Sequence, residues 1–167
     1  EIVYEGYGPG GIGIMVETLT DNKNRTVSDI RSTLSKAGGN MAENGAVAWQ
    51  FEQKGVIIVD IEANDAENLA LAAIDAGADD FETYDGTLHV YSEPNSLENI
   101  RSTLTDSEAN VSSTELSMIP NNTIMLDSKK AIQTLRLLDS LEELDDVQKV
   151  YSNADFPEDA LNNFKAS

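Results

Sequence analysis

The stretch that decides the fold covers residues 4–51 and reads YEGYGPGGIGIMVETLTDNKNRTVSDIRSTLSKAGGNMAENGAVAWQF. It opens with a glycine loop, YEGYGPGG, and continues into a short apolar run, Ile12–Leu19, that is typical of a strand. A polar turn then leads to an amphipathic helix, and the glycine turn Gly38-Gly39-Asn40 leads to a further strand. Strand, helix and strand, with glycine where the backbone turns sharply, predict an α/β domain.

The helix in this stretch is expected to begin near Thr26, because Thr26 and Asp29 have the spacing of an N-terminal capping box. Its apolar residues recur at helical spacing and define one inner face: Val27, Ile30, Leu34 and Ala37. Gly38 and Gly39 end the helix, as a left-handed cap requires. One side of this helix is therefore expected to pack on the sheet.

A hairpin is expected after the second glycine turn. Ala46–Gln53 alternates as a strand does, Lys54-Gly55 has the composition of a turn, and Val56–Ile61 is a second apolar strand. Trp49 and Phe51 are expected in the core, where large aromatic side chains dominate the packing.

Short strands and helices alternate through the rest of the chain. The patterns first predict a helix over Asp65–Ala76 ended by Gly77, and then a hairpin of Asp80–Tyr84 and Leu88–Tyr91 around Asp85-Gly86. A helix opened by Pro94 and Ser96 follows, with Leu97, Ile100 and Leu104 as its apolar residues, and after it a strand over Ser113–Ile119. The last predicted elements are a helix over Ser128–Leu144, with Leu135, Leu138 and Leu141 on its inner face, and a strand over Val147–Ser152.

This order of elements predicts an α+β fold of two α/β sandwich lobes, each with an antiparallel sheet and helices on one face. The first lobe lacks a second helix and a last strand, which residues 123–157 can supply. We therefore predict a discontinuous domain over 1–61 and 123–157, an inserted domain over 62–122 and a loosely held tail over 158–167. The pentapeptide IRSTL occurs at Ile30–Leu34 and again at Ile100–Leu104, and two lobes of one plan would place both copies equivalently.

The net charge of −19 limits the partners that this chain attracts, because thirty Asp and Glu stand against eleven Lys and Arg. Such a chain repels phosphate backbones and is not expected to supply most of the attraction for nucleic acid. The absence of cysteine excludes disulfides and thiolate chemistry. No apolar run approaches the ~20 residues of a membrane span, and no signal peptide is visible. We therefore expect a cytoplasmic protein without a membrane contact.

The glycine loop contains a literal G-x-G-x-x-G over Gly8–Gly13, but a dinucleotide fingerprint follows a strand and opens a helix, whereas this one precedes a strand. Two interpretations remain open: a backbone turn that needs positive φ, or a conformable loop that touches a partner. His89, the single histidine, is expected to be an ordinary strand residue without the partners of a metal site or a catalytic triad.

Other candidate sites are equally weak. Asp21–Asn24 resembles the start of a calcium loop but is not followed by the required glycine and glutamate. An acidic run near the end is interpreted as a solvated turn, with a loose divalent-cation site as the alternative: Glu142, Glu143, Asp145 and Asp146. No serine lies in a nucleophile elbow. We therefore expect no enzyme, no cofactor and no metal.

Basic side chains are frequent in the first third of the chain, at Lys23, Arg25, Arg31, Lys36 and Lys54. Arg25, Arg31 and Lys36 lie on or beside one expected helix, near both glycine turns. This small basic face either meets RNA or DNA phosphates or is an ordinary solvated helix surface, and both interpretations stay open.

Long motifs at both ends of the chain carry a family resemblance: EGYGPGG, VETLTDNKNRT, SKAGGN and ENGAVAWQF, then MIPNNTIML and LDSLEELDDVQKVYSNADF. They closely resemble the YebC/PmpR family, which includes the mitochondrial translational activator of cytochrome c oxidase. The similarity extends to Phe156. The chain departs from the family pattern at two places: Met41-Ala42 stands where the family usually has leucine and glycine, and Gly13 stands where alanine is common. Neither departure changes a glycine of the two turns.

The resemblance implies that the two lobes are ferredoxin-like and correspond to the family's second and third domains, one inserted in the other. It also implies an upstream basic helical domain that this chain lacks, in keeping with a first residue, Glu1, that is not methionine.

In function, the resemblance implies a non-enzymatic regulator of gene expression, either a DNA-binding transcriptional regulator or a translation factor at the ribosome. An acidic chain with few clustered bases suits a ribosomal RNA contact better than readout of a DNA duplex, for which the upstream basic domain would aid the affinity. The predicted contact residues are Tyr7, Gly8, Pro9, Gly10, Gly11, Lys23, Arg25, Arg31, Lys36, Asn40 and Asn44. The alternative is an acidic protein-interaction scaffold that binds no nucleic acid.

Overall fold

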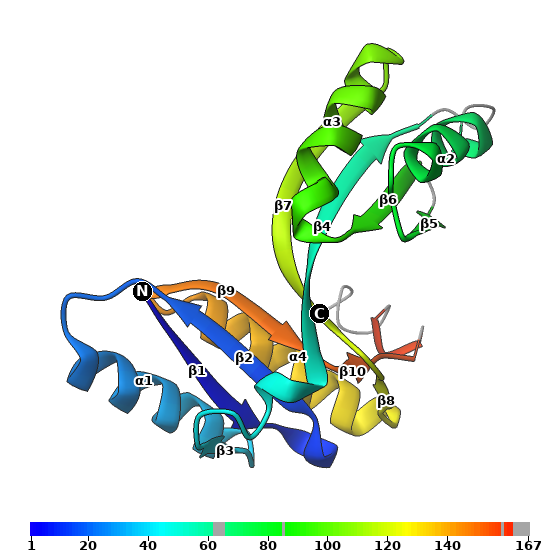
Figure 1. Ribbon diagram of the computed structural model, residues 1–167. Coiled ribbons are helices and arrows are strands. Elements are labelled where there is room, and N and C mark those ends of the chain that lie inside the picture. The colour runs from blue at the N-terminus through cyan, green and yellow to red at the C-terminus, as the bar shows by residue number, and fades with distance from the viewer. Residues whose placement is uncertain (62–65, 85, 158, 162–167) are drawn as a thin grey trace. The chain divides into compact units, whose positions relative to one another are not determined.

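The chain forms two compact units, shown in Figure 1 as a computed structural model that describes residues 1–61, 66–84, 86–157 and 159–161. One unit combines Glu1–Glu52 with Pro120–Ser167, and the other is Gln53–Ile119. Each unit contains one four-stranded sheet. Among the described residues, no helix has the length and apolar character needed to cross a membrane.

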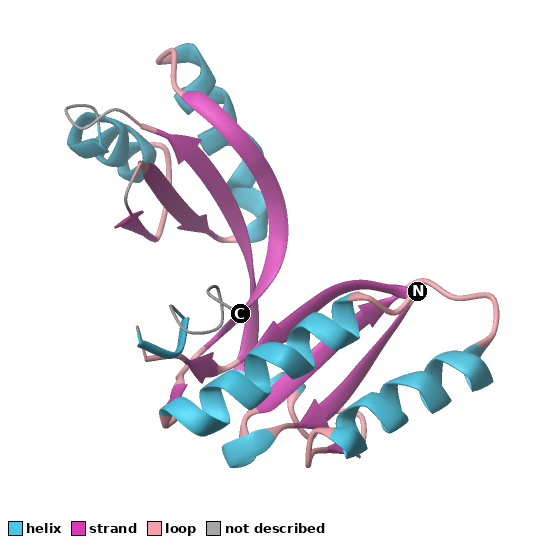
Figure 2. Ribbon diagram, turned by 180° about the vertical axis from the view of Figure 1, so that it is seen from behind, coloured by secondary structure: helices cyan, strands magenta, loops and turns pink. Residues whose placement is uncertain are grey.

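The first unit consists of a sheet in the order β3-β1-β2-β9, a parallel pair of short strands, β8 and β10, and two helices. Its elements are β1 (Ile2–Tyr7), the 3-10 turn η1 (Pro9–Gly11), β2 (Gly13–Thr18), α1 (Lys23–Lys36), β3 (Asn40–Ala42), the 3-10 turn η2 (Ala48–Gln50), β8 (Ile124–Met125), α4 (Ser128–Glu142), β9 (Val147–Ser152) and β10 (Ala154–Asp155). Both helices lie on the same face of the sheet (Figure 2).

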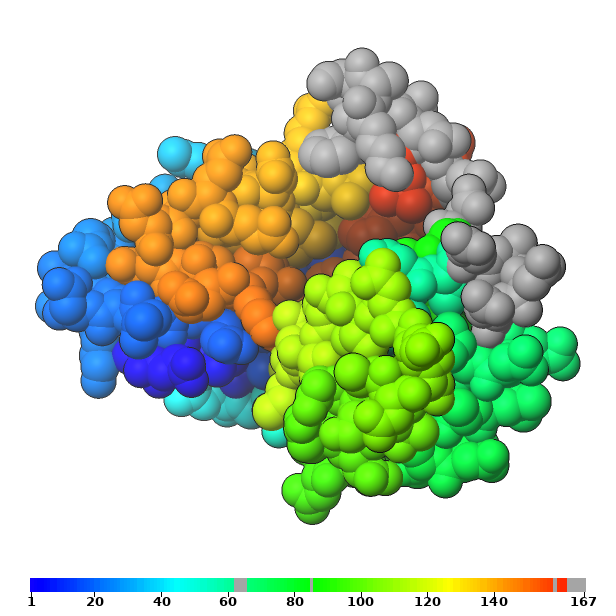
Figure 3. Space-filling model, turned by 90° about the horizontal axis from the view of Figure 1, so that it is seen from above, coloured from blue at the N-terminus to red at the C-terminus, as the bar shows by residue number. Residues whose placement is uncertain are grey.

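The core of the first unit lies between this face and the two helices. Its fully or almost fully buried side chains include Ile14, Val16, Ile30, Leu34, Leu137 and Leu141. The packing of α1 on β1 is close, because a Cβ atom at Gly6 would lie 2.8 Å from Cδ1 of Leu34. In the space-filling view, α4 and β9 lie next to each other on the surface of this unit (Figure 3).

The second unit is a sheet in the order β5-β6-β4-β7 with two helices. Its elements are β4 (Phe51–Asp60), α2 (Ala66–Asp75), β5 (Asp80–Tyr84), β6 (Thr87–Ser92), the 3-10 turn η3 (Pro94–Ser96), α3 (Leu97–Asp106) and β7 (Asn110–Pro120). This chain order and sheet order are those of the ferredoxin-like βαββαβ fold. The core contains Ile57, Val59, Leu88, Val90, Ile100 and Leu104.

The first unit has the same sheet order with one strand taken from a different place in the chain. Helix α1 connects β2 to β3 as α2 connects β4 to β5, and α4 precedes β9 as α3 precedes β7. The strand equivalent to β6 is β1, which comes first in the chain and pairs with both β2 and β3. The α+β class with two ferredoxin-like antiparallel sheets is therefore confirmed.

Three predictions about the first third of the chain are wrong. Residues 4–7, expected to belong to the glycine loop, are instead the end of strand β1, which covers Ile2–Tyr7. Helix α1 begins three residues before Thr26: Asn22 is the N-cap and its side chain accepts a hydrogen bond from the N–H of Arg25. Thr26 is buried inside the helix. Trp49 is 73% exposed, although Phe51 is buried as predicted.

The predicted hairpin around Lys54-Gly55 is also wrong, because Phe51–Asp60 is one continuous strand that pairs with β6. Gly55 is needed for packing rather than for a turn: a Cβ atom there would lie 2.7 Å from Cδ1 of Leu97 and 2.8 Å from Oγ of Ser92. The left-handed φ values of Gly38 and Gly77, +83° and +114°, do confirm the predicted helix ends.

The second half of the chain follows the sequence more closely. The strands over Asp80–Tyr84 and Val147–Ser152 are confirmed. On α4 the predicted inner-face residue Leu141 is buried and Leu138 packs against the core, whereas Leu135 is only partly buried. The other buried residues of α4 are Ala131, Thr134 and Leu137. The two IRSTL copies lie on α1 and α3, which are not equivalent helices, although both bury their isoleucine and leucine. Asp65, Asp85, residue 158 and residues 162–167 lie outside the described residues, and Ala160 is buried in the first unit.

Candidate functional site

The first unit carries a basic groove where the glycine loop, the end of α1 and one face of α4 meet. Its volume is about 780 Å³, and its lining residues are Pro9, Gly10, Thr33, Lys36, Ala37, Gly38, Lys130, Gln133, Arg136, Leu137 and Ser140. Three of these side chains are basic and none is acidic. We call this site the basic groove.

Helix periodicity brings the basic side chains of the groove together. On α4 the lining residues Lys130, Gln133 and Leu137 recur every three or four positions and so lie on one face of the helix. On α1, Lys36 occupies the last turn, where a cation also complements the helix dipole. Lys36, Lys130 and Arg136 form no ion pair with a carboxylate of the described residues.

The glycine loop closes one end of the basic groove. Gly10 and Gly11 have φ values of +77° and +80°, which confirms a turn that needs positive φ. A Cβ atom at Gly10 would lie 2.7 Å from Cδ2 of Leu126, so the loop backbone packs directly against the segment before α4. The loop is followed by strand β2 and opens no helix, unlike a dinucleotide-binding loop.

The structure brings only some of the predicted contact residues to the groove. Pro9, Gly10 and Lys36 line it, whereas Lys23 and Arg31 are exposed elsewhere on α1. The remaining members are placed as follows: Tyr7 ends β1 and donates its hydroxyl to the carbonyl of Ala46, Gly8 is buried, Gly11 is exposed, Asn40 is exposed at the start of β3 opposite Tyr7, and Asn44 is exposed in the turn before η2.

Arg25 has a structural partner. Its guanidinium contacts Asp146 through Nε, at 3.2 Å, and through Nη2, at 2.9 Å, and also pairs with Asp21. The hydrogen bond from Arg25, with a second from the hydroxyl of Thr26, holds the pKa of the Asp146 carboxyl below its usual value. Asp146, expected in a solvated turn, instead ties the start of α1 to the turn before β9.

Lys130 and Arg136 were missed from the sequence. The sequence shows bases on α4, but it does not show which face of α4 turns toward the end of α1. The contact between α1 and α4 arises because α4, which follows the inserted unit in the chain, is the second helix of the first unit. The available signal was the spacing of Lys130, Gln133 and Leu137 on one helix face.

A second feature of the first unit is the loop of residues 43–50, which is held by a buried carboxylate. Glu5, only 6% exposed, accepts hydrogen bonds from the N–H groups of Gly45, Val47 and Ala48 at 2.7–2.8 Å. Burial by itself raises the pKa of the Glu5 carboxyl, but the three N–H donors outweigh burial and leave that pKa below its usual value. Trp49 projects from this loop, and its indole N–H donates to the carbonyl of Ala46.

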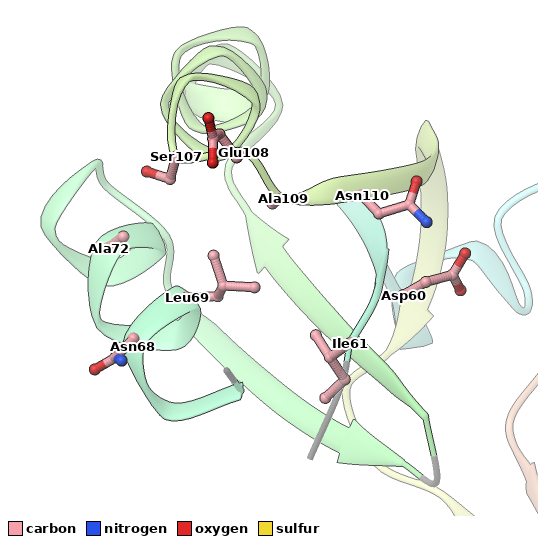
Figure 4. A pocket seen from close by; sticks show the side chains of 9 residues that line it. All are labelled: Asp60, Ile61, Asn68, Leu69, Ala72, Ser107, Glu108, Ala109 and Asn110. Atoms are coloured by element: carbon pink, nitrogen blue, oxygen red, sulfur yellow. The ribbon is translucent and has the colours of Figure 1, made fainter. Parts of the chain in front are cut away.

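The second unit has a cavity of about 800 Å³ with a different chemistry. It is lined by Asp60, Ile61, Asn68, Leu69, Ala72, Ser107, Glu108, Ala109 and Asn110 (Figure 4). Leu69 and Ile61 point toward its centre, and Ser107 and Glu108 lie at the C-terminal end of α3. The cavity contains carboxylates and no base, so it is unsuited to phosphate.

The bases of the second unit are neutralised locally. Gln53–Ile119 contains fourteen Asp and Glu but only Lys54 and Arg101 as bases. Lys54 pairs with Asp79 and Glu93, and Arg101 pairs with Glu98. His89, the single histidine, lies in β6 with its ring centroid 4.5 Å from that of Tyr84, which confirms a strand histidine.

Comparison with known proteins agrees with this fold. The model of the TACO1/YebC second and third domain matches residues 1–154. A probable transcriptional regulatory protein of Dehalococcoides mccartyi is 48% identical over 164 residues, which cover 98% of this chain and 65% of the relative. One from Chloroflexus aggregans is 49% identical over 166 residues, covering 98% of this chain and 66% of the relative.

A solved structure has the same architecture. The conserved hypothetical protein Aq1575 from Aquifex aeolicus superposes with a TM-score of 0.87 and 37% sequence identity, over 95% of this chain and 65% of that one. The chain thus spans just under two thirds of the length of the relatives that it matches. The matched family model, the sequence identities and the shared fold lead to one conclusion: this chain belongs to the TACO1/YebC family.

Proposed function

We propose that this chain is a non-enzymatic regulator of gene expression that binds the phosphates of DNA or ribosomal RNA through the basic groove. One observation carries the proposal: in a chain of net charge −19, Lys36, Lys130 and Arg136 converge on a groove with no acidic lining residue. Lysine and arginine without a local counter-ion supply the attraction on which phosphate binding depends. The relatives' name, probable transcriptional regulatory protein, agrees with a nucleic-acid ligand.

The composition of the groove also supports a binding role over catalysis. Its side chains are bases, hydroxyls, one amide and apolar groups, and no carboxylate or histidine is present to act as a general base. A regulator of this kind, with DNA or the ribosome as its partner, acts in the cytoplasm and needs no cofactor.

The test removes the three charges of the groove and measures nucleic-acid affinity across a salt series. The variant is Lys36→Gln/Lys130→Gln/Arg136→Gln, and the ligands are a labelled RNA oligonucleotide and a labelled DNA duplex. If three phosphate contacts are lost, the slope of log K against log salt falls by about 2 for a single strand, and affinity near 0.1 M salt falls about 100-fold.

The control variant is Lys23→Gln/Arg31→Gln/Lys129→Gln, which removes the same charge from exposed bases that do not line the groove. Its salt slope is expected to stay near that of the unmodified chain. Equal losses in both triple variants would show that only net charge matters, and an unchanged slope in the groove variant would refute the proposed site.

A protein-interaction scaffold is the second candidate function, and the charge of the second unit favours it. Fourteen acids and two paired bases make Gln53–Ile119 repel nucleic acid and attract basic protein surfaces. Co-sedimentation with ribosomes separates the two candidates. Loss of ribosome binding in the groove variant supports phosphate contacts, whereas full retention at every salt concentration supports the scaffold.

A further inference from the structure

Asn44 and Gly45 are the only Asn-Gly pair in the chain, and they lie exposed in the loop of residues 43–50. The Ala46 N–H donates to the carbonyl of Glu43 at 3.0 Å and closes a turn with Asn44 and Gly45 at its two central positions. Gly45 has a φ of +89°, whereas the φ of Asn44 is not positive. These are the features of a type II turn, which favours glycine at its second central position.

An asparagine that precedes glycine can lose its side-chain amide without an enzyme. The backbone nitrogen of Gly45 loses its proton to hydroxide and attacks Cγ of Asn44, because glycine has no Cβ to hinder the approach. A new C–N bond forms, the bond from Cγ to the side-chain nitrogen breaks, and that nitrogen takes a proton from water and leaves as ammonia. Water then opens the five-membered succinimide to aspartate or isoaspartate at position 44. The reaction therefore needs only water besides the chain itself.

Glu5 holds the nitrogen that would attack. Its Oε2 accepts the Gly45 N–H at 2.7 Å, while its Oε1 accepts the N–H groups of Val47 and Ala48. The Glu5 carboxyl, whose pKa lies below its usual value, is far too weak a base to remove an amide proton, so this hydrogen bond stabilises the protonated nitrogen. The Gly45 N–H is therefore directed at Glu5, a side chain that is 6% exposed, and is shielded from hydroxide.

The turn geometry also keeps the two reacting atoms apart. In a type II turn the first central residue has a ψ of about +120°, which does not bring the following nitrogen to that residue's own side chain. Ring closure requires a rotation of the Asn44 ψ, which breaks the turn and withdraws Gly45 from Glu5. The geometry for attack is therefore reached only when the loop opens locally.

We infer that Asn44 is a site of spontaneous deamidation that the fold protects through the hydrogen bond from Gly45 to Glu5. Conversion adds a carboxylate beside the residue that binds Glu5, and isoaspartate also routes the backbone through the side-chain methylene. Both changes oppose the anchor, so a converted loop is expected to stay detached from Glu5. This inference concerns the loop of residues 43–50 and does not depend on nucleic-acid binding at the basic groove.

The experiment follows Asn44 in the full chain during incubation at neutral pH. Proteolytic digestion and mass spectrometry give the extent of conversion at each asparagine, and a synthetic peptide of residues 40–50 gives the rate without the anchor. Conversion in the chain is expected to be slower than in the peptide by about 10-fold or more, because a hydrogen bond to a charged acceptor must first break.

Substitutions test the role of Glu5. Glu5→Gln is expected to accelerate conversion of Asn44 about 10- to 100-fold. Glu5→Asp keeps the charge but shortens the side chain by one methylene, so an intermediate rate is expected, and this variant replaces Glu5→Gln if the latter does not fold. Leu141→Ala, at a fully buried residue of α4, is the matched control, because it destabilises the same unit and leaves the anchor intact.

The result of conversion is read from Trp49, the only tryptophan, which projects from the same loop and is 73% exposed. Its fluorescence is expected to change in step with conversion, and unchanged fluorescence in the converted chain overturns the predicted detachment. Conversion of the full chain at the rate of the peptide shows that the fold gives no protection. Equal rates in the Glu5 variants and the unmodified chain, or equal acceleration by Leu141→Ala, show that Glu5 does not control the site.

Discussion

Glu5 is the residue on which the loop of Trp49 depends. A carboxylate that is 6% exposed is normally costly, but this one accepts three backbone hydrogen bonds from Gly45, Val47 and Ala48. The carboxylate also stabilises the loop, because this one side chain satisfies three N–H groups that would otherwise lack partners. The negative charge therefore has a structural role that is separate from the acidity of the surface.

Glu5→Gln is expected to destabilise the chain by about 2–3 kcal/mol, because a neutral amide offers one acceptor oxygen and turns an N–H donor toward the backbone N–H groups. Thermal or urea unfolding measures the loss at pH 7. Glu43→Gln removes the same charge from an exposed position in the same loop and is expected to change stability by less than about 0.5 kcal/mol. Equal effects of the two substitutions would contradict the anchoring role of Glu5.

The same pair of variants gives a pH dependence of known sign. The pKa of Glu5 is lower in the folded chain than in the unfolded one, so its contribution is complete above the ordinary glutamate pKa of about 4.3. The contribution is lost as the pH falls through the lower folded-state pKa. The difference in stability between the unmodified chain and Glu5→Gln should therefore shrink below about pH 4 and stay constant between about pH 6 and 8.

At the scale of elements, one close backbone approach helps to set the register of β3 in the first unit. Strand β3 pairs with the end of β1, Asn40 opposite Tyr7, directly after the glycine turn that ends α1. Gly38 needs its positive φ of +83°, but Gly39 needs space: a Cβ atom there would lie 2.2 Å from the Tyr7 carbonyl oxygen. Since that atom belongs to the backbone, the clash cannot be relieved by a side-chain rotation.

Gly39→Ala is accordingly expected to cost about 3 kcal/mol or more and to loosen β3, because overpacking against the backbone forces the strand apart. Gly38→Ala is the control: its Cβ meets nothing within 4 Å, so only the left-handed φ is penalised, by about 1–2 kcal/mol. Urea unfolding gives the two free energies, and amide exchange of β3 locates the change. A smaller loss for Gly39→Ala than for Gly38→Ala would refute the close-approach explanation.

The sequence predicted elements well where hydrophobic period and turn residues agree. The hairpin of β5 and β6 and strand β9 fall where expected, because Asp85-Gly86 and alternating apolar residues are strong local signals. Strand β1 was missed because its glycine and acid resemble a loop: Gly6 makes room for Leu34, and Glu5 binds a loop distant in sequence. Both reasons are tertiary contacts, which local patterns do not contain.

The predictions for Gly55 and Trp49 were wrong for the same reason, because tertiary contacts decide where both residues lie. Gly55 was interpreted as a turn but lies in β4, where Leu97 and Ser92 pack against it. Trp49 was expected in the core because of its size, yet the short turn η2 directs it outward while Val47 takes the buried position. The partners of Lys36 in the basic groove come from α4, nearly a hundred residues later, beyond the reach of spacing arguments.

For the whole molecule, charge is divided unequally between the two units. Gln53–Ile119 carries fourteen acids and two bases, whereas the other unit contains the remaining nine bases and sixteen acids. The two helices of Gln53–Ile119, α2 and α3, also end on acids, Asp75 and Asp106, without a base in the last turn. A negative charge at a helix C-terminus opposes the helix dipole, so the second unit combines global repulsion with two unfavourable local placements.

Asp75→Asn/Asp106→Asn is therefore expected to stabilise the chain by about 1 kcal/mol at low salt, since each removed acid relieves about 0.3–1 kcal/mol of unfavourable dipole interaction. The gain should shrink as salt rises, because screening already weakens the repulsion between exposed charges in the unmodified chain. Thermal unfolding at low and high salt measures both effects. Asp29→Asn/Glu43→Gln, at exposed acids of the first unit away from helix C-termini, is the matched control and is expected to leave stability within about 0.5 kcal/mol. An equal gain in the control would attribute the effect to net charge alone, and a gain that does not depend on salt would show that electrostatic repulsion is not its cause.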